Sequence, residues 1–245
     1  MPSDTASTND LCGRIARVRE RIACAEQRYG RAPDSVILIA ASKAQSATRI
    51  AAAAACGQYA FGENYLQEAA PKIAQLNEPH RGLSWHYIGP LQANKTGGVA
   101  KHFEWVHSVD RLKLATRLSA QRAAGSTPLK ICLQVNIDRE TGKAGVLVGH
   151  LPALAEQVAE LENLALCGLM AIPAATRDFA SQCKSFALVR KALDDLNRRG
   201  HRLAELSMGM SGDVEAAIAE GATMVRIGTA IFGARVRAKG SIPRG

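Results

Sequence analysis

The chain has 245 residues, of which 47% are hydrophobic and 22% charged, with a formal net charge of +9. This length and hydrophobic content fit one α/β domain with a single large core. No segment approaches the roughly 20 apolar residues that cross a bilayer, and the polar N-terminus lacks the order of a secretion signal. We therefore expect one cytoplasmic domain over residues 1–245, with residues 1–9 and 236–245 as loose tails and no membrane partner.

The excess positive charge is spread along the chain, with small groups in the first helix, at Arg198 and Arg199, and in the last ten residues. Only 4% of the residues are aromatic, and no stacking motif or groove-reading helix is recognisable. Solvated surfaces and helix C-termini explain these cations, and we expect no nucleic-acid partner. A basic nucleic-acid-binding protein stays an alternative, which neutralising the Arg-rich first helix would test.

The cysteines are widely scattered and form no Cys-x-x-Cys pair, and several lie inside apolar runs. This pattern is typical of small core residues, so we expect neither a disulfide nor a zinc site. The six are Cys12, Cys24, Cys56, Cys132, Cys167 and Cys183.

Helical and strand-like segments alternate along the chain. An amphipathic helix is predicted over about residues 10–30, and the segments that follow it are Ala-rich or have a 3.6-residue period. Between them lie eight apolar runs predicted as strands: residues 36–42, 59–62, 84–89, 105–109, 130–137, 165–172, 204–208 and 224–227. Repeated βα units indicate a parallel sheet, and eight of them close a (β/α)8 TIM barrel. The predicted fold is this barrel with an extra N-terminal helix.

The longest predicted crossover helix has one apolar face and ends before Gly200. Its face consists of Phe179, Phe186, Val189, Leu193 and Leu196. A doubly wound open sheet is the rival fold, but it would carry a Gly-rich turn after the first strand. The chain has Ser-Lys-Ala-Gln there, at residues 42–45.

Lys43 directly follows the apolar run 36–42, which reads as a strand buried on both faces. The carboxyl ends of such strands carry the chemistry of parallel sheets. Small neighbours at Ala41 and Ser42 leave room for a partly dry pocket, which favours the neutral amine and makes it a nucleophile toward aldehydes. The alternative is an ordinary solvated lysine on a loop.

The loops after the predicted strands seven and eight are suited to bind a phosphate. Ser211 and Gly212 would open a helix over residues 214–220, and Gly228 precedes Thr229 in the second loop. Glycine and serine also cap helices and make turns, which is the alternative for either loop alone. Together with Lys43, the two loops describe an aldehyde-reactive amine facing a phosphate cup, which is what pyridoxal phosphate needs.

The chain also resembles the pyridoxal phosphate homeostasis protein family over about residues 36–235. The similar segments are Ala41-Ser-Lys43, Phe61-Gly-Glu-Asn64-Tyr, Trp85-His-Tyr-Ile-Gly-Pro-Leu-Gln-Ala-Asn94-Lys95, Gln134-Val-Asn136, Gly168-Leu-Met170-Ala-Ile-Pro173, Leu206-Ser-Met-Gly-Met-Ser211 and Val225-Arg-Ile-Gly-Thr229-Ala-Ile-Phe-Gly233. This family resembles the barrel domain of alanine racemase. The resemblance therefore implies that barrel type, pyridoxal 5'-phosphate as the cofactor, and Lys43 as the residue that forms the Schiff base.

The resemblance also implies the residues around the cofactor. They are Lys43, Asn64, His86, Ser207, Met208, Ser211, Gly212, Arg226, Gly228 and Thr229. Ser211, Gly228 and Thr229 match positions of the phosphate cup, and Ser207 is a weaker candidate. Arg226 matches the residue that faces the pyridine nitrogen, where a permanent cation disfavours protonation and weakens the cofactor as an electron sink.

Four of these expectations compete with ordinary structural roles. Arg226 is flanked by Val225 and Ile227, so its side chain should alternate toward the barrel interior, although a surface cation is the alternative. The Asn64 amide could bond the cofactor's phenolic oxygen or cap a helix. His86 could pack beside the cofactor ring or be a hydrogen-bonded core histidine. Lys143, after strand five, could guide a phosphorylated ligand or be solvated.

We expect a protein that buffers and delivers pyridoxal phosphate, with pyridoxal-phosphate-dependent apoenzymes as recipients, and not an enzyme. Racemases of this architecture carry a second, β-rich domain that supplies a catalytic tyrosine and dimer contacts, and no such segment follows the predicted barrel. We therefore expect a monomer. A weak amino-acid racemase is the alternative, and it would need a second base near the substrate carbon, with Tyr65, Tyr87 and His86 as the candidates.

Overall fold

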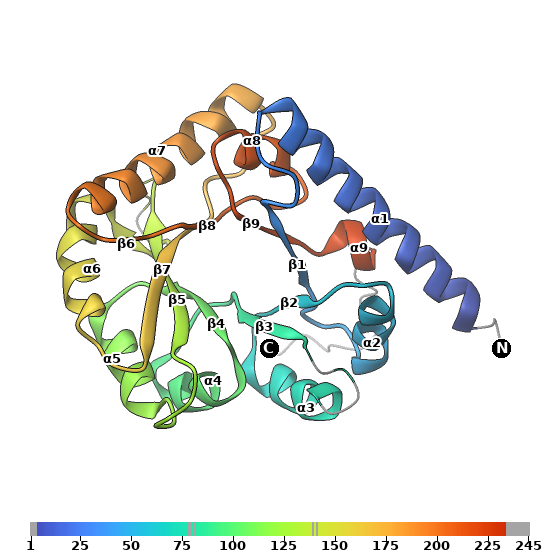
Figure 1. Cartoon of the computed structure of the whole chain (residues 1–245), viewed down its shortest axis with the longest axis horizontal. Helices are drawn as coiled ribbons and strands as arrows, with labels where there is room; N and C mark the ends of the chain where they lie inside the picture. The colour runs from blue at the N-terminus through green and yellow to red at the C-terminus, as the bar shows by residue number, and fades with distance from the viewer. Residues whose placement is uncertain (1–3, 78–79, 81, 139, 141, 234–245) are drawn as a thin grey trace, which may run out of the picture.

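The computed structural model describes residues 4–77, 80, 82–138, 140 and 142–233. Within these residues nine parallel strands form one sheet, in the order β4-β3-β2-β1-β9-β8-β7-β5-β6. β4 also pairs with β5, which closes eight of the strands into a barrel surrounded by helices (Figure 1). The predicted (β/α)8 barrel is therefore confirmed. The predicted C-terminal tail, residues 236–245, lies outside the described residues.

All eight predicted strands are present, with boundaries within two residues of the prediction. They are β1 (Ile37–Ala41), β2 (Ala60–Glu63), β3 (Ser84–Tyr87), β4 (Trp105–Val109), β5 (Leu129–Asn136), β7 (Leu164–Ala171), β8 (Glu205–Ser207) and β9 (Met224–Ile227). The unpredicted β6 (Val146–Leu147) pairs with the end of β5. Two residues are too few to produce a recognisable alternation.

The helices lie on the outside of the barrel (Figure 1). They are α1 (Asp4–Arg28), α2 (Ala47–Ala55), α3 (Leu66–Asn77), α4 (Thr96–His102), α5 (Leu112–Gln121), α6 (Leu151–Ala159), α7 (Phe179–Arg198), α8 (Val214–Ala219) and α9 (Thr229–Phe232), with 3-10 turns at Ala93–Lys95 and Val148–His150. In the described chain, none of the helices combines the length and the hydropathy that a membrane span requires.

The longest crossover helix, α7, buries most of its predicted apolar face. Phe186, Val189, Leu193 and Leu196 are buried, and the helix ends just before Gly200 as predicted. Phe179 is 44% exposed, which contradicts its predicted place on that face. It is the first residue of the helix, and the buried stripe begins one turn later.

The barrel interior is apolar in one part and polar in another. A small cluster from six different strands forms the apolar part, and it consists of Ile39, Ala60, Trp105, Cys132, Met170 and Met224. Polar side chains are also buried on the strands, and they include His86, His107, Ser207 and Arg226. The larger core lies between the strands and the helices.

Helix α1 packs along the outside of α2, α8 and α9 (Figure 1). It begins at Asp4, so residues 4–9 extend the helix and do not form the expected loose tail. The apolar stripe that predicts the helix begins only at Leu11, and the polar residues before it carry no such signal. Part of the basic surface is also structural, because Arg21 donates to the Ser211 carbonyl at 2.8 Å and Arg28 pairs with Glu215.

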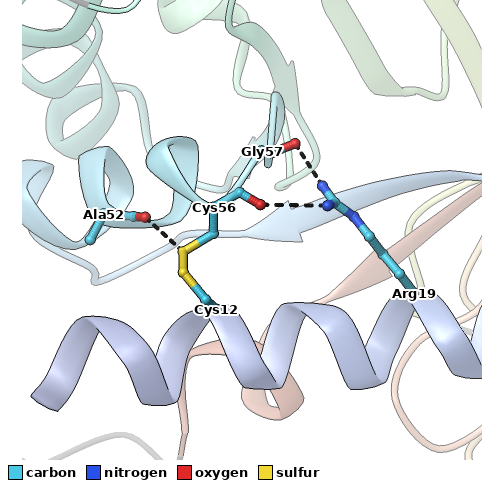
Figure 2. The surroundings of a disulfide bond; sticks show 5 residues. All are labelled: Cys12, Arg19, Ala52, Cys56 and Gly57. Carbon is cyan, nitrogen blue, oxygen red and sulfur yellow. Dashed lines mark hydrogen bonds between the residues drawn. A yellow bond between two sulfur atoms is a disulfide. The ribbon is translucent and has the colours of Figure 1, made fainter.

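A disulfide between Cys12 and Cys56 joins α1 to the residue that ends α2 (Figure 2). The expectation that the chain has no disulfide is therefore wrong. The two cysteines are 44 residues apart in sequence, and only the packing of α1 on α2 brings their Cα atoms to 5.2 Å. Next to the bond, Arg19 of α1 donates to the Gly57 carbonyl at 2.6 Å, so a second contact ties the same two elements.

Candidate functional site

The predicted site residues converge where four neighbouring strands end. In the register of the sheet, Ala41 of β1 pairs with Gly62 of β2, and Ala40 pairs with Ile227 of β9. β8 lies beside β9. Because parallel strands end at the same edge, the residues that follow β1, β2, β8 and β9 share one mouth of the barrel. These residues include Lys43, Asn64, Ser211 and Gly228.

Lys43 lies in a tight turn directly after β1. Ser42 donates its backbone N–H to the Gly62 carbonyl at 2.9 Å, and the Gln45 N–H closes the turn on the Ser42 carbonyl at 2.9 Å. Ala44 has a φ of 62°, the left-handed conformation, which costs a residue with a Cβ roughly 1–2 kcal/mol. Lys43 is half-buried. The turn fixes the backbone at Lys43, two residues after β1 ends.

A buried carboxylate, which sequence reasoning missed, is hydrogen-bonded to this turn. Glu63, the last residue of β2, is fully buried and accepts the Ser42 hydroxyl at 2.6 Å and the Lys72 ammonium at 2.8 Å. It thereby ties the ends of β1 and β2 together next to Lys43. The available signal was a carboxylate at the end of an otherwise apolar strand, since such a group is rarely buried without a partner.

Asn64 begins the loop after β2, as predicted, and packs against β3's exit loop. A Cβ on Gly89 would lie 2.3 Å from the Asn64 carbonyl oxygen, so only glycine allows this approach. In the described part of the chain, the buried side-chain oxygens of Asn64 and Asn136 have no hydrogen-bond partner. Unpaired buried oxygens are costly, and both therefore suit a ligand that can donate hydrogen bonds.

The loop after β8 runs from buried to exposed residues. Ser207 and Met208 are fully buried, Ser211 is half-buried and Gly212 is exposed. The predicted helix after this loop is confirmed as α8. An open pocket of about 390 Å³ lies beside the loop, lined by Met210, Gly212, Asp213, Gln182 and residues 175–177.

The Gly228 loop packs directly against the end of β1. Gly228 follows β9, and a Cβ on it would lie 3.2 Å from the Ala41 carbonyl oxygen. Thr229, the first residue of α9, is exposed. The second proposed phosphate loop therefore lies beside the strand that carries Lys43.

Arg226 of β9 points into the barrel interior, as strand alternation predicts. Its Nη1 donates to both the carbonyl and the hydroxyl of Ser207 at 2.6 Å, and its Nη2 donates to the Ala171 carbonyl at 3.0 Å. Burial lowers the pKa of Arg226 to about 10, against the raising effect of Asp213 and Cys132. The guanidinium remains cationic at neutral pH.

His86 has the contacts of a hydrogen-bonded core histidine. Its Nε2 lies 3.1 Å from the Ser84 hydroxyl, its Nδ1 lies 2.9 Å from His107 Nε2, and its ring stacks on Trp105. Burial, and secondarily Lys130, lowers the pKa of His86 to about 3.

Lys143 is exposed and ion-paired. It pairs with Glu140 at 2.8 Å and with Asp138 at 3.4 Å. These pairs raise its pKa.

Comparison with known proteins places the chain among its relatives. The family described as alanine racemase, N-terminal domain, matches residues 14–236. The pyridoxal phosphate homeostasis protein of Pseudomonas aeruginosa is 56% identical over 90% of this chain and 94% of its own length. The chain belongs to the pyridoxal phosphate homeostasis protein family. Another relative in this family, from Escherichia coli K12, is 49% identical over 93% of this chain and 97% of its own length.

Solved structures have the same fold as this chain. PipY of Synechococcus elongatus, solved with PLP bound, is 39% identical to this chain, with a TM-score of 0.80. The match covers 91% of this chain and the whole of the PipY chain. Alanine racemase of Corynebacterium glutamicum is 16% identical, with a TM-score of 0.68, and covers 96% of this chain and 64% of its own. At that identity the racemase shares the fold alone.

Proposed function

We propose that this protein holds pyridoxal 5'-phosphate as a Schiff base on Lys43 and acts in cytoplasmic pyridoxal phosphate homeostasis. It buffers and delivers the cofactor without committed catalysis. The observation that carries this proposal is the strained turn that presents Lys43 beside the Gly228 loop, in a chain 39% identical to a protein solved with PLP bound. The cofactor supplies an aldehyde that condenses reversibly with an amine.

The residues at the barrel mouth fit this cofactor. Ser211, Gly212, Gly228 and Thr229 offer hydroxyl and backbone N–H donors for a phosphate, on two loops next to the β1 end. The unpaired buried Asn64 oxygen lies in the adjoining loop. Ser207, the last residue of β8, and Met208, which follows it, are fully buried and lead into the Ser211 loop. In this proposal His86 keeps its hydrogen bonds to Ser84 and His107 and would support the site from the barrel interior.

The three candidate second bases, Tyr87, His86 and Tyr65, are not set up to take a proton from a substrate. Tyr87 donates its hydroxyl to the Pro90 carbonyl at 3.0 Å, and burial raises its pKa to about 12. His86 is committed to Ser84 and His107. Tyr65 is 56% exposed to solvent. None of the three therefore has the setting of a poised base, and racemisation of L-alanine should be no faster than with free pyridoxal phosphate.

The proposal includes a monomer that passes its cofactor to pyridoxal-phosphate-dependent apoenzymes, with no nucleic-acid or membrane partner. Schiff-base condensation is reversible, so a recipient lysine can take over the aldehyde. Two arginines of the basic first helix are used internally, in the Arg21 and Arg19 contacts, and this favours a structural explanation for part of the charge.

A titration with pyridoxal phosphate, followed by absorbance, tests the assignment of residues. Wild type should develop a visible imine band, and Lys43→Ala should bind without that band. Ser211→Ala and Thr229→Ala should keep the band at saturation, with affinity lowered about 10-fold or more, because each loses a hydrogen bond to a charged group. Lys191→Ala, which removes an exposed lysine of α7, is the matched control and should behave as wild type.

Two outcomes would count against the proposal. A visible band retained in Lys43→Ala would move the Schiff base to another lysine. Unchanged affinity in both hydroxyl variants would place the phosphate elsewhere.

A further inference from the structure

A continuous chain of hydrogen bonds crosses the barrel interior from Arg226 to Ser84. Arg226 Nη1 lies 2.6 Å from Ser207 Oγ, and Ser207 Oγ lies 2.7 Å from His107 Nδ1. His107 Nε2 lies 2.9 Å from His86 Nδ1, and His86 Nε2 lies 3.1 Å from Ser84 Oγ. The chain links β9, β8, β4 and β3, which lie around the barrel.

The guanidinium at one end favours one direction along this chain of hydrogen bonds. A guanidinium can only donate, so the Ser207 oxygen accepts from Arg226 and its own proton can be given to His107 Nδ1. A neutral His107 then carries its proton on Nε2 and donates to His86 Nδ1. By the same logic His86 carries its proton on Nε2 and donates to Ser84.

Burial keeps both rings neutral, which this direction requires. His107 is fully buried and His86 is 2% exposed. Burial is the main cause that lowers the pKa of both rings. Lys130 further lowers the pKa of His86, and His86 and then Arg226 further lower the pKa of His107. In this direction an imidazolium at His86 would also place its Nδ1–H against the Nε2–H of His107.

We propose that His107 and His86 are positioning residues for Arg226, acting through Ser207. The chain fixes both rings as Nε2-protonated tautomers and holds the guanidinium in one rotation, with Nη1 on β8 and Nη2 on the Ala171 carbonyl of β7. One part of this inference rests on the proposed function, namely that Arg226 faces the pyridine nitrogen of the cofactor. Its structural part is testable without any cofactor.

The first experiment is long-range ¹H–¹⁵N NMR on cofactor-free protein labelled at histidine, near pH 7. The signals of His86 and His107 are assigned from the variants His86→Gln and His107→Asn. Both rings should show the pattern of a neutral imidazole protonated at Nε2. An Nδ1-protonated His107, or an imidazolium at either position, would overturn the proposal.

A pair of variants then separates positioning from core filling. In His107→Asn the side-chain oxygen takes the position of Nδ1 and can still accept a hydrogen bond from Ser207. In His107→Gln the longer side chain places its amide near His86, so Ser207 loses its acceptor. The measured quantity is the rate of rotation about the Arg226 Nε–Cζ bond in cofactor-free protein. Slow rotation gives separate NMR signals for the two Nη atoms, and fast rotation averages them. Slow rotation should persist in wild type and His107→Asn, and fast rotation should appear in His107→Gln.

Affinity for pyridoxal phosphate gives the link to function. His107→Gln should bind the cofactor about 3- to 10-fold more weakly, with His107→Asn close to wild type. Slow rotation retained in His107→Gln would contradict the proposal. If wild type bound no pyridoxal phosphate, the proposed function would fail while the tautomer and rotation results still decided the positioning role.

Discussion

Lys43 depends on neighbours that its own sequence position does not reveal. The apolar run before it predicts the strand, and the strand end predicts its place at the barrel mouth. The turn strain at Ala44 and the Glu63 carboxylate that ties β1 to β2 depend on backbone angles and on cross-strand pairing, which no local pattern encodes. The orientation of Arg226 was predictable because alternation along a strand is local.

The buried histidines make the protein sensitive to acid. The unfolded-state pKa of a histidine is about 6.5, whereas the folded-state pKa of His86 is about 3. Between these values the unfolded chain binds a proton that the folded chain excludes, so stability falls as pH decreases below about 6.5. Each such histidine contributes a slope of about 1.4 kcal/mol per pH unit in that window.

Urea unfolding of wild type and His86→Gln between pH 4 and pH 8 measures this effect. The variant should lose stability less steeply with acid, by about 1.4 kcal/mol per pH unit. Burial raises the pKa of Glu104, so its contribution to the pH dependence of stability has the opposite sign. Because both proteins contain Glu104, the difference between them reports the histidine. Equal slopes in the two proteins would show that His86 is protonated in the folded state.

At the scale of elements, α1 shows what periodicity captures and what it omits. Its apolar stripe predicts a helix packed on the barrel. The stripe says nothing about which helix it meets, so the disulfide to Cys56 and the Arg21 contact with the Ser211 loop could not be derived. Both are contacts between segments far apart in sequence.

The disulfide should stabilise the fold by restricting the unfolded chain. In a non-reducing buffer, Cys12→Ser should be less stable than wild type by roughly 2–4 kcal/mol in denaturant unfolding, because the bond closes a long loop. Cys24→Ser, an exposed cysteine on the same helix, is the matched control and should change little.

Two further readings make that comparison decisive. Reductant should bring wild type close to Cys12→Ser, and the number of reactive thiols in unfolded protein should rise by one in that variant. A thiol count that falls by one in the variant, together with equal stabilities, would mean that the bond does not form in solution.

For the whole molecule, eight apolar runs separated by helical segments were enough to predict the closed barrel. Strand order follows from successive βα units, and the last barrel strand then pairs with the first. The division of the interior into an apolar cluster and a polar chain was not predictable, because each half is assembled from residues of several strands. Arg226 is buried in the polar part, near the barrel mouth where Lys43 lies.

Borohydride reduction after incubation with pyridoxal phosphate, followed by mass analysis of the peptides, tests the covalent capture at Lys43 most directly. We predict a yellow imine band that reduction abolishes, and a pyridoxyl mass on the peptide that contains Lys43. A protein that stays colourless and unmodified with excess cofactor, or a label on Lys72 or Lys95 in place of Lys43, would contradict it.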